Sequence, residues 1–499
     1  MPPHPMNEHA VAVERHLGAR YPSPAPFHPS TSHPECPFRD VGPQNAVYDL
    51  VRSSFLALGL DSDHYGQSSW NPLGCLISPG NKVVIKPNLV LAGRKGSATE
   101  WMQVVTHGSA VRAVMDYVLV ALEGRGSIII LDGPQFDADW DLLIRRTGLA
   151  ELCSYVSRRS EVPVSLLDLR DKWLDCRGDV KYGERPLPGD PDGGIHVDLG
   201  RHSRLFGYRG EGSYHGSDYD RAETNRHHSG TRQEYLLAAT AVSADVFINV
   251  PKMKTHKKVG VTLSLKNLVG ISSGRNWMPH FTLGDPSTGG DQYPAPSLRT
   301  ASERFGITRL QGITQKHPRV APAFRLAKRV ARPLFGDTQT TSRSGNWYGN
   351  DTCWRMVHDI NRALLYCDGS GSLVQRPKRY LSVVDGIVSG EGRGPEDPDA
   401  LDTGLIVAGF NPVAVDCVAA TLMGFDPQRI PVLARAFDEH ALPLARFGFD
   451  EIRVRSNVDA WDAPLADIDP AACYAFEPHF GWRGTIELKG RVAGGASAQ

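Results

Sequence analysis

Between residues 82 and 131, apolar strand-like segments alternate with a helix-like segment, and this order limits the possible folds most strongly. Residues 82–91 (KVVIKPNLVL) are typical of a buried strand that ends near Pro87, and residues 127–131 (SIIIL) of a second one. Between them, residues 110–122 predict a helix with Ser109 as its N-cap. Strand, helix and strand in this order form a βαβ unit. We therefore expect an α/β protein with a mainly parallel sheet flanked by helices, with large loop-rich insertions.

The rest of the 499 residues extends this unit or interrupts it. Further strands are predicted at residues 244–250, 380–385 and 403–409, and further helices at 46–60, 358–366 and 413–423. Proline-, glycine- and histidine-rich stretches separate these elements. We expect an irregular arm at 1–42, a first α/β part at 43–275 with a Gly-, Tyr- and His-rich excursion at 171–235, an insertion at 276–350, a second α/β part at 351–435 and a C-terminal extension at 436–499.

Charge and cysteine content exclude several classes of protein. Lys and Arg number 55, as do Asp and Glu, so bulk charge does not predict a nucleic-acid partner. No stretch approaches the roughly 18 apolar residues of a membrane span, and the first residues lack the pattern of a secretory signal. The eight cysteines form no CxxC pair, so we expect no iron–sulfur cluster, and thiols scattered through a long chain favour the cytoplasm.

Polar residues follow the predicted strands at the points where the strands end. They are Lys86 and Asn88 after the first strand, Asp132 after the second, Lys252, Lys254 and His256 after the third, and Asp385 at the end of the fourth. Ligands of open parallel sheets usually bind beyond these carboxyl ends. If the strands are neighbours, lysines, a histidine and carboxylates converge there. The alternative for any one of them is a residue that only caps a loop.

The segment PKMKTHKK at residues 251–258 is the sharpest local feature. It surrounds His256 with four lysines directly after an apolar strand, and Lys266 and Asn267 follow shortly after it. Lysines in this position favour binding of a carboxylate or phosphate. The competing interpretation is a basic loop in contact with solvent, the commoner outcome for a run of charge.

Three other positions could contribute to chemistry. His107 precedes a predicted helix, where it is either an acid or base beside a ligand or a structural cap. Glu391 lies between glycines in the predicted loop GIVSGEGRGPEDPD, which could bind phosphate, place Glu391 on a metal, or form a lid. Asp416 opens the last predicted helix, where it faces the same edge of the sheet or interacts with the helix dipole.

Residues 322–335 (PAFRLAKRVARPLF) predict a short basic amphipathic helix. Its apolar stripe either packs on the protein's own core or lies weakly on an anionic membrane surface.

Five blocks of the sequence resemble, in order, the domain-of-unknown-function family 362. They are VVIKPNLV, THGSAVRAVMDYVL, ADVFINVPKMKTHKKVGVTLSLKNLVGI, HDINRALLY and the stretch from VVDGIVSGEGRGP to LMGFDP, within about residues 80–430. Some members carry iron–sulfur segments whose cysteines are absent here. Longer members are similar to proteins encoded among polysaccharide-biosynthesis enzymes.

The resemblance and the strand ends together define the expected site. We expect catalysis by His107, His256, Asp385 and Glu391, binding of substrate by Lys86, Asn88, Lys252, Lys254, Lys266 and Asn267, and a divalent metal, if one is used, on Asp132, Asp385, Glu391 and Asp416. The expected function is that of a cytoplasmic enzyme acting on an anionic, phosphorylated or carboxylated small molecule, with a metal and a surface-polysaccharide pathway as further hypotheses. The alternative is a non-catalytic binding or assembly protein of a glycan pathway.

Overall fold

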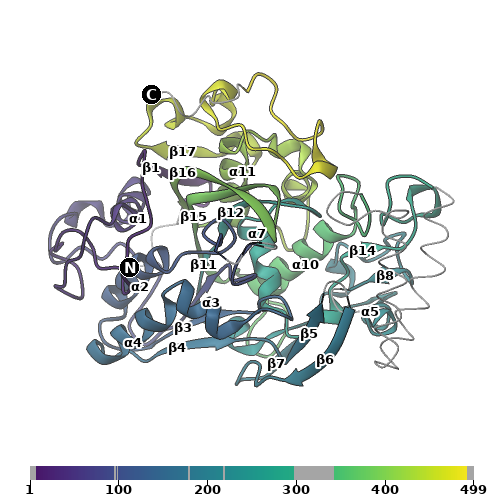
Figure 1. The fold of residues 1–499 in the computed structure, drawn as a ribbon, viewed down its shortest axis with the longest axis horizontal. Coiled ribbons are helices and arrows are strands. Elements are labelled where there is room, and N and C mark those ends of the chain that lie inside the picture. The colour runs from purple at the N-terminus through teal and green to yellow at the C-terminus, as the bar shows by residue number, and fades with distance from the viewer. Residues whose placement is uncertain are drawn as a thin grey trace.

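A large sheet runs through the middle of the chain (Figure 1). The computed structural model describes residues 7–94, 97, 99–177, 180–216, 220–296 and 342–491. The strand order is β17-β1-β16-β15-β11-β2-β3-β4, and β12 pairs with β15 and with β13. The strands of this path are β1 (Ala10–Arg15), β2 (Lys82–Pro87), β3 (Ser127–Asp132), β4 (Val164–Asp168), β11 (Val246–Val250), β15 (Arg379–Arg393), β16 (Asp397–Gly409) and β17 (Arg453–Ser456). From β15 to β4 the strands are parallel, and β16 is antiparallel to both of its neighbours.

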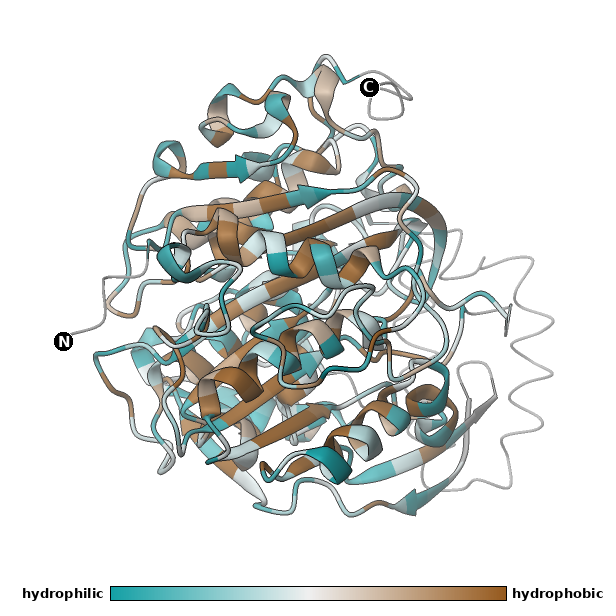
Figure 2. Cartoon of the chain, turned by 90° about the vertical axis from the view of Figure 1, so that its left-hand side faces the viewer, coloured by the Kyte–Doolittle hydropathy of each residue, from teal (hydrophilic) through white to brown (hydrophobic). Residues whose placement is uncertain are grey.

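Helices cover both faces of the sheet, so the fold is α/β as expected. One core contains α1 (Ala46–Ala57), α2 (Gly108–Leu122) and α4 (Leu149–Arg159), and the other contains α10 (Cys353–Tyr366) and α11 (Pro412–Leu422). Alternate residues of one strand enter opposite cores: Val83 and Ile85 enter the first and Val84 the second. A strand buried on both faces must be apolar throughout, which is why the central strands are the continuously hydrophobic segments in Figure 2.

The remaining elements lie mostly in the excursion and near the described ends of the insertion. They are α3 (Trp140–Arg146), β5 (Lys172–Arg177), β6 (Val180–Pro186), β7 (Gly194–Asp198), β8 (Tyr214–His215), α5 (Arg221–His227), β9 (His228–Ser229), β10 (Arg232–Ala238), α6 (Ala239–Val242), β12 (Lys252–His256), β13 (Gly260–Val261), α7 (Ser264–Asn267), β14 (Phe281–Thr282) and α12 (Pro431–Ala434). Strand β14 pairs with β8, which joins the insertion to the excursion. The amphipathic helix expected at residues 322–335 lies outside the described residues.

The N-terminal arm differs from the expectation of an irregular segment. Residues Ala10–Arg15 form β1, which is inserted between β16 and β17 of the sheet. Val11, Ala12 and Val13 are fully buried there. The short AVAV run is the sequence signal, and its proline- and histidine-rich surroundings obscured it.

The predicted loop at residues 386–399 is largely strand. Strand β15 continues through Arg393 and β16 begins at Asp397, so the two form one long hairpin. Glycines in this hairpin allow β12 to approach it closely. A Cβ on Gly394 would lie 2.0 Å from the Thr255 carbonyl oxygen, and one on Gly390 would lie 3.0 Å from the Lys254 Cβ. The glycines that suggested a flexible loop instead let another strand cross the hairpin.

Candidate functional site

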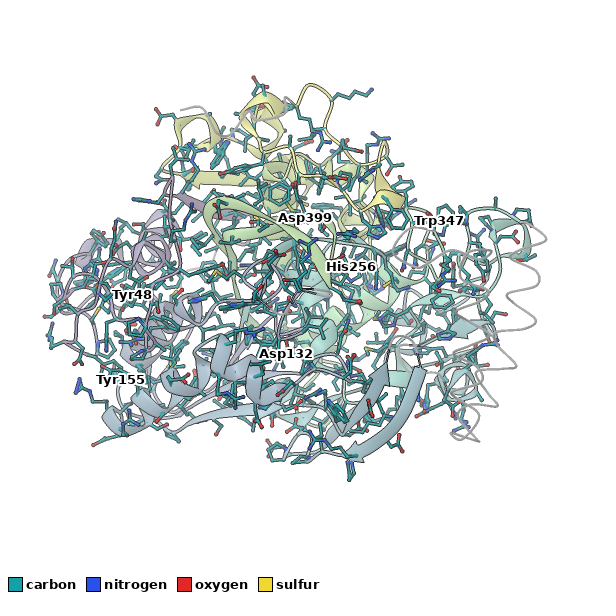
Figure 3. The ribbon with its side chains drawn as sticks, viewed as in Figure 1. Tyr48, Asp132, Tyr155, His256, Trp347 and Asp399 are labelled. Carbon is teal, nitrogen blue, oxygen red and sulfur yellow. The ribbon has the colours of Figure 1, made fainter. Side chains whose placement is uncertain are left out.

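The carboxyl ends of four neighbouring strands bring most of the expected site residues together. Strands β15, β11, β2 and β3 are adjacent in that order. Lys86 lies near the end of β2 and Asp132 ends β3. Asp385 of β15 is in register with Lys252 of β12. Asp132 and His256 both lie among the central elements of the molecule (Figure 3).

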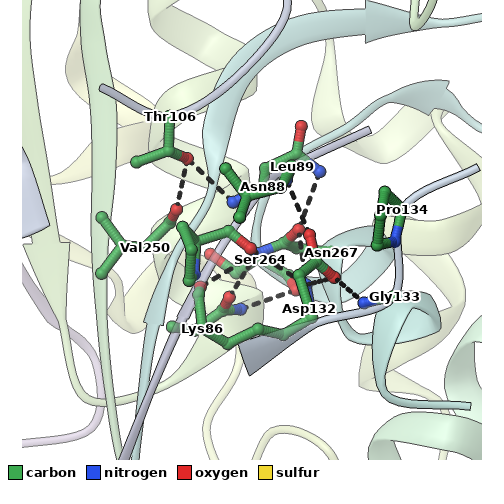
Figure 4. Close-up of polar contacts among 12 residues, drawn as sticks. Lys86, Asn88, Leu89, Thr106, Asp132, Gly133, Pro134, Val250, Ser264 and Asn267 are labelled. Atoms are coloured by element: carbon green, nitrogen blue, oxygen red, sulfur yellow. Dashed lines mark hydrogen bonds and ion pairs between the residues drawn. The ribbon is translucent and has the colours of Figure 1, made fainter. Parts of the chain in front are cut away.

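The Lys86 ammonium is fully buried and hydrogen-bonded on all sides (Figure 4). It donates to Asp132 Oδ1 at 2.7 Å, to the Pro87 carbonyl oxygen at 3.1 Å and to Asn267 Oδ1 at 3.2 Å. Three acceptors match the three hydrogens of an ammonium group. Burial lowers the pKa of Lys86, and the Asp132 carboxylate opposes that shift. This lysine therefore holds the sheet edge together and has no donor left for a substrate.

The other oxygen of Asp132 ties the loop after β2 to the same centre. Asp132 Oδ2 accepts from the Leu89 amide at 2.6 Å, and Oδ1 also accepts from the Gly133 amide at 2.8 Å. The backbone at Gly270 packs directly against this ion pair, because a Cβ on Gly270 would lie 2.1 Å from Asp132 Oδ1 and 2.9 Å from Lys86 Nζ. Position 270 thus requires glycine.

Two predicted substrate-binding amides also bond within the protein. Asn88 Nδ2 donates to Asn267 Oδ1 at 2.8 Å, and Asn267 Nδ2 donates to Asn249 Oδ1 at 2.7 Å. The Asn88 side-chain oxygen is buried and has no partner among the described residues. In this network, only that oxygen is left to accept from a bound molecule.

A second ion pair joins Lys252 and Asp385, which are both fully buried. Lys252 Nζ lies 3.2 Å from Asp385 Oδ2, and Tyr21 links the two, donating to Asp385 Oδ1 at 2.6 Å and accepting from Lys252 at 2.5 Å. The amide of His107 completes the shell of Asp385, donating to Oδ2 at 2.9 Å. Tyr21 comes from the arm expected to be irregular, and no pattern in that segment predicted its role.

His107 is the N-cap of α2 and is buried among aromatic rings. Its Nδ1 accepts from the Ser109 amide at 3.1 Å, so His107 takes the capping position that was predicted for Ser109. The imidazole stacks on Tyr21 with 4.1 Å between ring centroids, and on Trp101 with 5.5 Å. Burial lowers the pKa of His107 to about 3. The ring is therefore neutral at physiological pH.

Strand β12 overturns the interpretation of its basic residues as a solvated loop. Lys252, Lys254 and Thr255 are 0% exposed. Lys254 Nζ donates to the carbonyl oxygens of Val104 and Pro395. Burial lowers the pKa of Lys254 well below its usual value, and the nearby Lys252 lowers it further. The burial of two lysines on one short strand is costly, and the carbonyl groups and the Asp385 carboxylate offset that cost.

At the end of β12 and beyond it lies a group of basic residues, which we call the cationic cluster: His256, Lys257, Lys258, Lys266, Arg275 and His280. Burial lowers the pKa of Lys266, and the neighbouring Lys86, Lys257 and Arg275 lower it further. Lys257 forms an ion pair with Glu396 at 2.7 Å. Lys266 is partly shielded and has no hydrogen-bond or ion-pair partner among the described residues. The cluster therefore carries an excess of positive charge.

Asp416 and Glu391 do not join the other carboxylates. Asp416 accepts from the amides of Ser264 and Leu265 at 2.7 and 2.8 Å and so holds the start of α7, which carries Lys266. Burial raises the pKa of Asp416 to about 7. Glu391 accepts from the Glu477 amide at 2.8 Å, toward the C-terminal extension. Within the described residues, no group of three or more histidines, cysteines or carboxylates has the geometry of a metal site, and the metal predicted on Asp132, Asp385, Glu391 and Asp416 stays a prediction.

Three contributors were missed at the level of sequence: Tyr21, Arg275 and His280. Arg275 donates to the carbonyl oxygens of Gly133 and Pro134 at 2.8 and 2.7 Å. His280 precedes Phe281, whose ring centre lies 4.9 Å from Lys258 Nζ. Both follow the last apolar block of the first α/β part, so only the tertiary fold places them here.

Comparison with known proteins places the cationic cluster in a described family. A family model, Domain of unknown function (DUF362), matches residues 206–421. The chain is also 21% identical over 364 residues to a thylakoid-associated protein of Synechocystis sp., which covers 72% of this chain and 69% of that protein. In the part of the chain that the structure describes, no helix combines the length and apolar character of a membrane span. Residues 206–421 contain β11, β12, α7, α10 and the β15–β16 hairpin, and it is this part of the chain that matches the DUF362 family.

Proposed function

We propose that this protein is an enzyme that binds a phosphorylated or carboxylated small molecule at the cationic cluster. The observation that carries the proposal is Lys266, a shielded ammonium group with no acceptor among the described residues. A shielded charge without a partner is unfavourable unless a counter-ion reaches it. An anionic ligand would supply that counter-ion and would also offset the repulsion from Lys257, Lys258 and Arg275.

Among the four expected catalytic residues, His256 fits the acid–base role best. Its Nδ1 accepts from the Lys258 amide at 3.0 Å, so in the neutral ring Nε2 carries the proton. No described residue accepts that proton, and after burial Lys266 lowers the pKa of His256 more than any other charged group does. We assign His256 as the group that donates a hydrogen bond, and in turnover a proton, to the ligand. Asp385 and His107 belong to the ion-pair network around Lys252, which lies on the same strand as His256.

A non-catalytic binding protein is the second candidate. Lys86, Lys252 and Lys254 all donate to acceptors inside the protein, and Asp132 and Asp385 accept from donors inside it. Side chains whose hydrogen bonds are all made within the protein can shape a binding surface without taking part in a reaction. The two functions share the anion and differ in whether it is converted.

The test is to identify what the purified protein retains. Protein is isolated under mild conditions and denatured, and the released phosphorylated and carboxylated molecules are identified by mass spectrometry. Lys266→Met should release much less of the retained anion, whereas Lys489→Met, which removes an exposed lysine, should match the wild type. Equal retention by all three proteins would contradict the proposal. Conversion of the identified anion by wild type and not by His256→Asn indicates an enzyme, and binding without conversion indicates the second candidate.

Location and pathway remain hypotheses with their own tests. The similar Synechocystis protein is described as thylakoid-associated, and residues 322–335 carry the basic amphipathic pattern of a weak membrane-surface contact. Flotation with anionic liposomes at low and high salt tests that contact against a cytoplasmic location. The polysaccharide pathway stays a prediction, for which a retained sugar phosphate would be the support. No metal is included in the proposed chemistry.

A further inference from the structure

Two histidines of the cationic cluster are held by the backbone in opposite tautomers. His256 Nδ1 accepts from the Lys258 amide, so Nε2–H is a donor. His280 Nδ1 lies 2.8 Å from the Met278 carbonyl oxygen, which can only accept, so the neutral ring has its proton on Nδ1 and a lone pair on Nε2. One ring therefore offers a donor and the other an acceptor.

The same two lysines act electrostatically on both imidazoles. Lys266 and Lys258 each lower the pKa of His256 and of His280, after burial, which is the largest cause for both. The His280 segment is held against the turn after β12, since Lys258 Nζ lies over the ring of Phe281 at 4.9 Å. His256 is only 5% exposed, and no described residue bonds to Nε2 of either ring. Protonation of His280, which would turn its acceptor into a donor, is opposed by burial and by these two lysines.

We propose that the cationic cluster selects a phosphate group that retains one proton, bound with its charged oxygens on Lys266 and His256 Nε2–H and its P–OH donated to His280 Nε2. This assignment rests on the proposed function and narrows its ligand class. Hydrogenphosphate or a singly protonated phosphate monoester satisfies both histidines. Sulfate has the same shape and a double negative charge, but it has no proton to give. It would leave the His280 lone pair facing an anion oxygen, and an acceptor that is shielded from water without a donor weakens binding.

The probes are inorganic phosphate and sulfate, each titrated into the wild-type protein by calorimetry near pH 7.5 at matched ionic strength, where phosphate carries close to two charges. We expect phosphate to bind about tenfold or more tightly than sulfate. In His280→Phe, which removes the acceptor, the preference should disappear, while His16→Phe, an exposed control, should retain it. The wild-type comparison needs no variant, so it decides the matter even if His280→Phe fails to fold.

The outcomes separate this inference from the proposed function. Equal binding of phosphate and sulfate, lost in Lys266→Met, overturns the selection of a protonated phosphate and leaves the anion site standing. A phosphate preference that persists in His280→Phe also overturns it. If neither anion binds the wild type, both the selection and the proposed anion site are contradicted.

Discussion

Two groups of basic residues in this protein differ in how their positive charge is compensated. In the inner ion pairs, Lys86 with Asp132 and Lys252 with Asp385, each ammonium has a carboxylate and further acceptors. In the cationic cluster, Lys266 has no described partner and its neighbours are mostly of the same sign. A position at the carboxyl end of a strand is therefore not enough to identify a ligand-binding lysine. The set of partners that each lysine already has decides between a structural role and a binding role.

The largest expected effect comes from breaking an inner ion pair. Asp132→Ala leaves the Lys86 ammonium buried without its carboxylate, and breaking such a pair costs about 3–5 kcal/mol. We expect the free energy of unfolding, measured in urea, to fall by that amount. Asp402→Ala is the matched control: its pair with Arg20 is formed by side chains 55% and 64% exposed, and should be worth less than about 1 kcal/mol. Equal losses in the two variants would mean that the Lys86 pair is not the support described here.

A smaller loss should follow removal of one hydroxyl group from the second ion pair. Tyr21→Phe deletes the bridge between Lys252 and Asp385 while keeping the ring that stacks on His107. Hydrogen bonds to charged groups contribute about 1.5–3 kcal/mol, and loss of stability in that range is expected from thermal or urea unfolding. Tyr348→Phe, at an exposed tyrosine, is the control. If both variants lose the same amount of stability, the Tyr21 hydroxyl does not support the ion pair.

The pH dependence of stability tests whether the buried His107 is neutral in the folded protein. The pKa of His107 is about 3 in the folded protein and about 6.5 in an unfolded chain, so below pH 6.5 the unfolded state binds the extra proton. Stability should therefore fall as the pH drops from 6.5 toward 3. His107→Asn keeps a cap acceptor and removes this proton, so its curve of unfolding free energy against pH should be shallower by up to about 1.4 kcal/mol per pH unit. The other buried histidines contribute equally to the pH dependence of the wild type and of His107→Asn, so the difference between the two curves reports on His107. Parallel curves would show that His107 is protonated in the folded state.

Much of the fold could be predicted because its central strands are buried on both faces. Continuous apolar runs such as the one in β3 leave few alternatives, and the strand ends then place Lys86 next to Asp132. The segments whose form depends on distant neighbours were misjudged. In the sequence, the glycines around Glu391 indicate a loop, whereas in the structure they allow β12 to cross the hairpin. Strand β1 forms because it pairs with β16 and β17, which lie far along the chain.

For the candidate site, the residue types were predicted better than their roles. The sequence grouped Lys86, Lys252, Lys254 and Lys266 as equal ligands for an anion. Hydrogen bonding separates them, because Lys86, Lys252 and Lys254 each have a carboxylate or carbonyl partner from a distant part of the chain. His280 and Tyr21 stand in segments without periodicity, so nothing local signals their place beside the lysines.

The most direct test of the account is urea unfolding of the wild type and Lys266→Met, each with and without inorganic phosphate. Without phosphate, removing an uncompensated charge should leave stability unchanged or raise it by up to about 1 kcal/mol, opposite in sign to the loss expected for Asp132→Ala. With phosphate at about 100 times its dissociation constant, the wild type should gain about 2.7 kcal/mol and the variant almost nothing, so the order of stability reverses. A clear loss of stability in Lys266→Met without phosphate, or an equal gain by both proteins with it, would contradict the claim that the cationic cluster is an uncompensated anion site.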